Sequence, residues 1–241
     1  MAGCKNYSFK QMQAHENQPG LEGKVATHHM KLHHLAAGFP QGTVVEFGVA
    51  AGRSTCAFIH AVELTGGHLY SVDIGDFSDV VTSDAWTFIQ QSDQNKDAIL
   101  AVAPAIASGI DLLHIDSKHA RSHVEALLMK WYPLVKPGGY ITFHDVDPTP
   151  YLRGQRKDSP RHELEGVALA DVVREFFFAN EDDLLLEFHF GSTGMGIMQK
   201  LAAMGTAPNP PRRLPSRQNR FSAEGIYWTA RHQVRRLVRG E

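Results

Sequence analysis

Acidic and imidazole side chains follow two apolar runs in the middle of the sequence. Asp116 comes directly after IDLLHI (residues 110–115), and His144 and Asp145 come directly after YITF (residues 140–143). If these runs are neighbouring parallel strands, their ends place two carboxylates and an imidazole together. Such a set, completed by water, suits a divalent cation such as Mg²⁺, and its imidazole suits manganese or iron equally. We therefore predict a metal site formed by Asp116, His144 and Asp145.

His119 lies three residues beyond Asp116 and is the candidate proton acceptor. An imidazole can take a proton from a hydroxyl group near neutral pH. His119 could instead cap the helix that is expected to follow it. The acids also have a structural alternative, in which Asp145 receives hydrogen bonds from a neighbouring loop and His144 packs beneath it. The sequence leaves both pairs of alternatives open.

A glycine turn lies nearer the amino end, within VVEFGVAAGRST (residues 44–55). A short apolar run ends in Glu46, Gly48 allows a tight turn, and a helical run follows Gly52. We expect Gly52 to leave room for a ligand against the backbone. The free N–H groups at a helix start bind a carboxylate or phosphate, and open α/β sheets use this arrangement to hold nucleotides. A dinucleotide site uses G-x-G-x-x-G, whereas this chain has G-x-x-x-G.

Two further polar positions follow strand-like runs. Asp73 ends the run after Leu69, where an acid is placed to accept hydrogen bonds from ribose hydroxyls. Ser92 and Asp93 follow the run that ends at Gln90. The carboxyl ends of parallel strands share one edge of a sheet, so all these side chains are candidates for a single site.

The elements that would position these residues alternate between strand and helix. We expect strands near residues 43–47, 68–73, 86–90, 110–115, 139–144, 184–190 and 194–200. We expect helices near residues 25–37, 53–64, 95–107, 119–134 and 162–179. Such alternation predicts a doubly wound, Rossmann-like α/β fold, with a mostly parallel sheet and helices on both faces. A tight glycine turn joins the last two strands, so the last of the seven must run antiparallel.

The glycine spacing, with an acid two residues before the first glycine, resembles motif I of the class I S-adenosylmethionine (SAM) methyltransferases. The set LLHIDSKHARSHV … WYPLVKPGGYITFHDV is similar to the O-methyltransferase group that includes sugar- and antibiotic-tailoring enzymes and catechol O-methyltransferase. GSTGMGIMQK (residues 191–200) resembles the final antiparallel strand of that group, so the resemblance covers Val25 to Lys200. Lys118 and Ala120–Arg121 depart from the sugar-type pattern, in a loop that would face the acceptor.

The resemblance implies a SAM-dependent transferase that methylates a hydroxyl of a small molecule, which would be a sugar, a phenol or a natural product. It places the adenine edge of the cofactor at Ser92 and Asp93. It places the metal ion, expected to be magnesium, on Asp116, His144 and Asp145, and it makes His119 the base. The full set of expected cofactor-binding residues is Glu46, Gly48, Gly52, Ser54, Asp73, Ser92, Asp93 and Asp116. A nicotinamide-dependent reductase on a similar sheet and a non-catalytic SAM-binding protein remain the alternatives.

The length, composition and charge of the chain limit its domain number, its location and its substrate class. A chain of 241 residues suits one domain with a full core. No apolar run reaches membrane-spanning length and no signal-peptide core is visible, so we expect a cytoplasmic protein. Cys4 and Cys56 indicate neither a disulfide framework nor a metal motif. The whole chain carries −2 and residues 201–241 carry +6, which leaves −8 on residues 1–200 and argues against nucleic acid as a substrate.

The two ends differ from the centre. Residues 1–23 are expected to form a loose segment that could fold over the pocket, and residues 24–200 form the predicted domain. Residues 201–241 are a basic Pro/Arg-rich linker leading to a predicted helix at Gly225–Arg239. That helix could dock on its own acidic body, pack on a second subunit in a homo-oligomer, or lie on a membrane surface. The long polar loop after Asp147 predicts acceptor contacts by Tyr151, Arg153, Arg156 and His162.

Overall fold

The computed structural model describes residues 3–152 and 160–214, together with residues 223, 226, 227, 230, 231 and 234. The chain forms two compact units, Met1–Pro211 and Arg212–Glu241. Most of the predicted helix at Gly225–Arg239 lies outside the described residues, as do Arg153 and Arg156. Among the helices that the structure describes, none is both long and apolar enough to cross a membrane.

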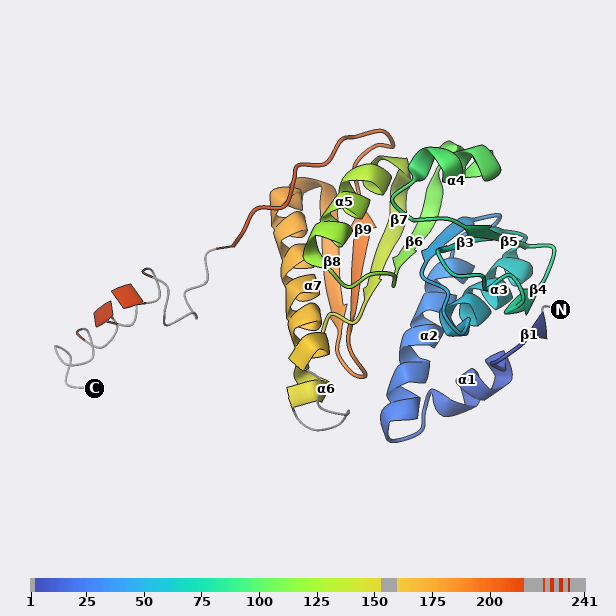
Figure 1. Cartoon of the computed structure of the whole chain (residues 1–241), viewed down its shortest axis with the longest axis horizontal. Helices are drawn as coiled ribbons and strands as arrows, with labels where there is room; N and C mark the ends of the chain where they lie inside the picture. The colour runs from blue at the N-terminus through green and yellow to red at the C-terminus, as the bar shows by residue number, and fades with distance from the viewer. Residues whose placement is uncertain are drawn as a thin grey trace. The chain divides into compact units, whose positions relative to one another are not determined.

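A seven-stranded sheet forms the centre of the first unit (Figure 1). Its order is β5-β3-β2-β6-β7-β9-β8, and β9 runs antiparallel to both of its neighbours, β7 and β8, whereas the other strand pairs are parallel. This confirms the predicted Rossmann-like fold. The strands are β2 (Thr43–Phe47), β3 (His68–Asp73), β5 (Trp86–Gln90), β6 (Ile110–Ile115), β7 (Val135–His144), β8 (Leu184–His189) and β9 (Met195–Lys200).

Helices cover both faces of the sheet because successive strand residues point to opposite sides. Val44 and Leu112 face α2 and α3, where they pack with Phe58. Val45 and Leu113 face α4, α5 and α7, in a core that includes Trp131, Phe176 and Ile99. All six residues of β6 are buried, as a central strand covered on both faces requires. The main helices are α2 (Leu21–Ala37), α3 (Arg53–Thr65), α4 (Lys96–Val102), α5 (Arg121–Trp131) and α7 (Pro160–Ala179), with a short α6 (Thr149–Leu152).

Three element boundaries near a proline differ from the prediction, and α2 also begins earlier, at Leu21 rather than at residue 25. Strand β7 begins at Val135 rather than at residue 139, and its pairing with β6 shifts register between Ile110 and Leu112. The segment Pro137–Gly139 therefore forms an irregularity inside the strand rather than a turn before it. The two predicted helices at 95–107 and 119–134 each end in a separate 3₁₀ turn, at Pro104–Ser108 and Tyr132–Leu134. Proline near the start of each turn cannot donate the N–H that would continue the α-helix.

The amino-terminal segment is more ordered than the sequence predicts. β1 (Gly3–Cys4) pairs antiparallel with β4 (Val81–Thr82), and α1 (Phe9–His15) follows it. Cys4 forms a disulfide with Cys56 in α3, so the expectation that the two cysteines do not pair is wrong. They are 52 positions apart, and this spacing carries no signal of pairing. Met12 of α1 packs with Met30 and Cys56 in a small apolar cluster, which explains why the segment is held on the body.

The first unit continues beyond Lys200, where composition alone suggests a boundary. Leu201 N donates to Asp183 O at 2.8 Å and Gly205 N donates to Pro133 O at 2.8 Å. Asn209 N donates to Asn180 Oδ1 at 2.7 Å. These contacts hold the start of the Pro/Arg-rich stretch against the body up to Pro211.

Candidate active site

The predicted metal ligands meet at the carboxyl ends of β6 and β7. These strands are parallel neighbours, so Asp116 follows one beside His144 and Asp145 of the other. His144 Nδ1 lies 3.1 Å from Asp145 Oδ1 and 3.7 Å from Asp116 Oδ2. One ligand atom from each of the three residues can be chosen so that all lie within 4.8 Å of one another. Two carboxylates and one imidazole at this spacing fit a single divalent cation.

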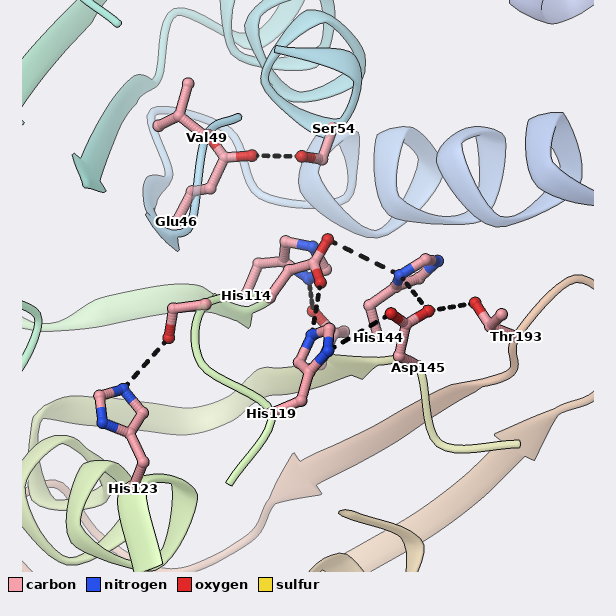
Figure 2. Close-up of polar contacts among 12 residues, drawn as sticks. Glu46, Val49, Ser54, His114, His119, His123, His144, Asp145 and Thr193 are labelled. Atoms are coloured by element: carbon pink, nitrogen blue, oxygen red, sulfur yellow. Dashed lines mark hydrogen bonds and ion pairs between the residues drawn. The ribbon is translucent and has the colours of Figure 1, made fainter. Parts of the chain in front are cut away.

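His119 lies beside Asp145 (Figure 2) and contacts both Asp145 and Asp116. Its Nε2 is 3.2 Å from Asp116 Oδ1, and its Nδ1 is 3.5 Å from Asp145 Oδ2. Helix α5 begins at Arg121 and has no side-chain cap, so His119 makes these contacts in place of a capping bond. Burial alone would lower the pKa of His119, but the Asp116 hydrogen bond and the Asp145 charge raise it above the usual range. The side chain is 22% exposed, which leaves it accessible to a ligand.

Asp145 is held by the backbone and by Thr193. Its φ of 59° is in the left-handed region, which Asp adopts more readily than most residues. The Thr193 hydroxyl donates to Asp145 Oδ1. Thr193 was not singled out from the sequence; it reaches the site because β9 pairs with β7 and the glycine turn before β9 lies at the same edge.

Both carboxyl groups of the cluster have lowered pKa values. Burial opposes ionisation of Asp116, but His144 and His119 together outweigh it. Burial likewise opposes ionisation of Asp145, and the neighbouring His144, His119 and Thr193 outweigh it. Two ionised carboxylates therefore face the same space at neutral pH, which is the electrostatic setting for a bound cation or a protonated imidazole.

The glycine turn lies directly against this cluster. Gly48 has a φ of 94°, and a Cβ added there would lie 2.3 Å from the Asp116 carbonyl oxygen. A side chain at this position would displace the end of β6. Gly52 has a φ of 79°, and a Cβ added there would lie 3.0 Å from Val80 Cβ. A side chain at Gly52 would thus meet Val80, which directly precedes β4.

Glu46 is fully buried beneath the turn. It accepts hydrogen bonds from Ser54 Oγ at 2.5 Å, Thr55 Oγ1 at 2.8 Å and Ser71 Oγ at 2.7 Å. These bonds tie the start of α3 to β2 and β3, and the Ser54 hydroxyl is occupied by them (Figure 2). Burial raises the pKa of Glu46 to about 7, although the three hydroxyl donors act in the opposite direction.

Because the pKa of Glu46 is raised in the folded protein, the free energy of unfolding should depend on pH through this residue. The folded state holds the carboxyl proton more tightly than the unfolded chain, so this contribution to stability is complete below about pH 4.5 and is lost as pH rises through about 7. We expect Glu46→Gln to flatten the fall in unfolding free energy between pH 5.5 and 8.5 by roughly 2 kcal/mol. Urea unfolding at several pH values measures this. The exposed Glu187→Gln is the matched control, and equal slopes in wild type and Glu46→Gln would contradict the prediction.

The remaining predicted cofactor residues lie along the same edge. Asp73 accepts hydrogen bonds from Val49 N at 2.8 Å and Gly75 N at 2.9 Å, which holds its carboxylate beside the glycine turn. Asp93 is buried and accepts from Ser117 Oγ at 2.6 Å, with His123 Nε2 at 2.8 Å from the same oxygen. Ser92 Oγ accepts from Gln94 N at 3.3 Å. Ser117 directly follows Asp116, so these groups adjoin the cluster.

Part of the chain matches a family of known proteins. Residues 45–146 match a family model described as a methyltransferase domain. The match runs from β2 to the end of β7 and contains the glycine turn, Asp73, Asp93 and the whole Asp116–His119–His144–Asp145 cluster. No curated protein sequence matches the chain significantly.

Solved structures share the fold at low sequence identity. MycE methyltransferase from the mycinamycin biosynthetic pathway, in complex with Mg and SAH, is 18% identical with a TM-score of 0.53. The match covers 87% of this chain but 58% of MycE, so the chain spans little more than half of that protein. The methyltransferase PaMTH1 of Podospora anserina, bound to SAH, is 11% identical over 79% of this chain and 86% of its own, with a TM-score of 0.53. Residues 45–146 are thus similar to a methyltransferase domain, and these solved structures share the fold of the chain.

Proposed function

We propose that the chain is a SAM-dependent O-methyltransferase that acts on a hydroxyl of a small molecule, which would be a sugar, a phenol or a natural product. The observation that carries the proposal is His119, held between two ionised carboxylates beside the glycine turn. The structure of MycE with Mg, SAH and mycinamycin VI supports an acceptor of this size on the same fold. Incubation with SAM and a panel of hydroxylated acceptors, read by mass spectrometry, tests the proposal; methylation of RNA, DNA or protein alone would refute it.

The similarity of residues 45–146 to a methyltransferase domain favours a methyltransferase over the nicotinamide-dependent reductase that the sequence leaves open. A non-catalytic SAM-binding protein would have no use for a partly exposed imidazole beside two ionised acids. The polar cluster therefore favours an enzyme over a binding protein.

The cofactor would lie along the edge formed by the glycine turn, Asp73 and Asp93. Both Asp73 oxygens already accept a backbone N–H, and each retains a further acceptor position for a ribose hydroxyl. Ser92 and Asp93, at the end of β5, would meet the adenine edge. Glu46 and Ser54 would act indirectly, because their bond to each other fixes the start of α3. SAM bound there would supply an electrophilic methyl group.

Asp73→Ala is expected to weaken binding of S-adenosylhomocysteine by at least about tenfold, because it removes the proposed ribose acceptor and its bond to Val49 N. Isothermal titration measures the affinity. Asp76→Ala is the matched control, since Asp76 is exposed in the next turn and bonds only to Ser78 in the hydrogen bonds described. No binding by the wild type, or equal binding by both variants, would count against the pocket.

His119 would act as the base. In its neutral form it accepts the proton of the acceptor hydroxyl, and the imidazolium so formed is stabilised by Asp116 and Asp145 on either side. Holding the acceptor oxygen in line with the methyl group supplies most of the remaining gain in rate. Tyr151 and His162, whose ring centroids are 5.6 Å apart beyond the end of β7, are the described candidates for acceptor contact.

Asp116, His144 and Asp145 would hold a divalent ion, and their donor set fits one. Such an ion, when bound, lowers the pKa of the acceptor hydroxyl and fixes its orientation. The two carboxylates suit Mg²⁺, and the imidazole extends the fit to manganese or iron. Thr193 would then serve to orient the Asp145 carboxylate.

A further inference from the structure

Residues 3–7, called the strap below, cross the start of α3 and contact the glycine turn. Asn6 Nδ2 donates to Ala51 O at 3.1 Å, inside the turn itself. The Arg53 guanidinium lies 4.7 Å from the centroid of the Tyr7 ring. Cys4 is bonded to Cys56, which lies one turn further along α3. The strap is therefore attached to the element that carries the proposed cofactor contacts.

The strap also holds the loop that follows Asp73. Gly3 and Cys4 pair with β4, and Lys5 N donates to Val80 O at 2.9 Å. Lys5 also forms an ion pair with Asp79. Val80 is the residue that a side chain at Gly52 would meet. The strap thus joins the glycine turn to the loop beyond Asp73, which are two walls of the proposed pocket.

The disulfide is the strongest of these attachments. The paired strands β1 and β4 contribute only two residues each, and the Lys5–Asp79 pair is exposed, so it adds little. A covalent bond across 52 positions restricts the chain far more than these contacts do. Loss of the bond would leave the strap held by these contacts and by the packing of Tyr7 against the Met12–Met30 cluster.

The surroundings of the two sulfur atoms suit exchange with an external thiol. Cys56 is fully buried, whereas Cys4 is partly exposed at the surface. A ring nitrogen of His60 lies within 4.8 Å of both sulfur atoms. Burial lowers the pKa of His60, so its imidazole is neutral near pH 7 and can accept a thiol proton. Cys4 is the sulfur that a small thiol or disulfide can reach, and Cys56 is the partner that completes the exchange.

From these contacts we propose that Cys4 and Cys56 form a reversible thiol–disulfide switch that sets the affinity of the cofactor pocket. The oxidant is a small disulfide of the glutathione class. The Cys4 thiolate attacks one sulfur of that disulfide and releases one thiol, and Cys56 then attacks Cys4 Sγ in the mixed disulfide and releases the second. Two protein thiols are oxidised, one small disulfide is reduced to two thiols, and a high thiol concentration reverses the reaction.

The oxidised protein should bind the cofactor more tightly because its strap and the loop beyond Asp73 are already ordered. In the oxidised protein both walls are already tied together before the cofactor arrives. In the reduced protein the strap and the loop must be ordered on binding, which subtracts from the binding free energy. We expect the oxidised protein to bind S-adenosylhomocysteine at least about threefold more tightly than the reduced protein. This expectation rests on the proposed cofactor pocket.

The experiment uses the full chain equilibrated in glutathione buffers of varied ratio. Maleimide labelling with mass spectrometry counts free thiols, hydrogen exchange reports the ordering of residues 3–16, and titration measures S-adenosylhomocysteine affinity. Cys4→Ala removes the bond at the accessible position and should show the weaker affinity in every buffer. Lys5→Ala removes only the ion pair with Asp79 and should keep the redox response.

Three outcomes would overturn the switch. In the first, both thiols stay free at every glutathione ratio. In the second, the oxidised and reduced proteins have equal S-adenosylhomocysteine affinity and equal hydrogen exchange in residues 3–16. In the third, the reduced protein takes up stoichiometric Zn²⁺, which protects both thiols from maleimide. The last would mean that Cys4, Cys56 and His60 form a metal site instead. If neither form binds S-adenosylhomocysteine while exchange in the strap still follows the redox state, the proposed pocket fails and the switch of the strap is supported.

Discussion

Replacing Asp145 with asparagine should lower kcat roughly 10²-fold or more, because it removes one of two carboxylates from the proposed cation site. The amide keeps the size of the side chain and can still accept from Thr193. Wild-type activity should likewise fall after chelation with EDTA and return on addition of Mg²⁺ or Mn²⁺. The measurements are steady-state methyl transfer to an acceptor found in the panel, and S-adenosylhomocysteine affinity, which should change little.

Asp147→Asn is the matched control for Asp145→Asn. Asp147 lies two positions along in the same loop, is buried, and accepts a hydrogen bond from Thr149 N at 2.9 Å that an asparagine oxygen can also accept. It contributes nothing to the described Asp116–His144–Asp145 group. Full activity after chelation, together with a similar mild loss in both variants, would exclude a catalytic metal and leave His119 as base without one.

His119→Ala should reduce kcat roughly 10²- to 10⁴-fold while S-adenosylhomocysteine affinity stays near the wild-type value, because the imidazole is the proposed proton acceptor. Lys118→Ala is the control, since Lys118 is the exposed neighbour on the same loop. An equal loss in both variants would indicate disturbance of the loop rather than loss of a base.

The pH profile gives a second readout for His119. The neutral imidazole is the active form, so wild-type kcat should rise with pH as His119 loses its proton. The flanking acids raise the pKa of His119 while no cation is bound to them. The residual activity of His119→Ala should lack this rise. A variant profile that keeps the wild-type rise would assign the titration to another group.

The positions of the strands and the meeting of Asp116, His144 and Asp145 were predictable because their signals are local. Each strand is a short apolar run, and the chemistry-bearing residues directly follow such runs. Parallel strands in a doubly wound sheet end at one edge, so Asp116, His144 and Asp145 could be placed together before their distances were known. The glycine turn could also be predicted, because its glycine spacing and the helix that follows it lie within one stretch of sequence.

The tertiary structure decided the features that depend on distant contacts. Thr193 reaches Asp145 only because β9 pairs with β7, and Val80 lies against Gly52 only because its loop folds back onto the turn. Glu46 is satisfied by hydroxyls from α3 and β3, which a motif written along one chain segment does not show. The Cys4–Cys56 bond is the clearest case, since its two residues lie in elements with no shared sequence pattern. Local runs and turns therefore determined the fold and the candidate chemistry, whereas packing between distant segments determined which groups support that chemistry and what ties the amino terminus to it.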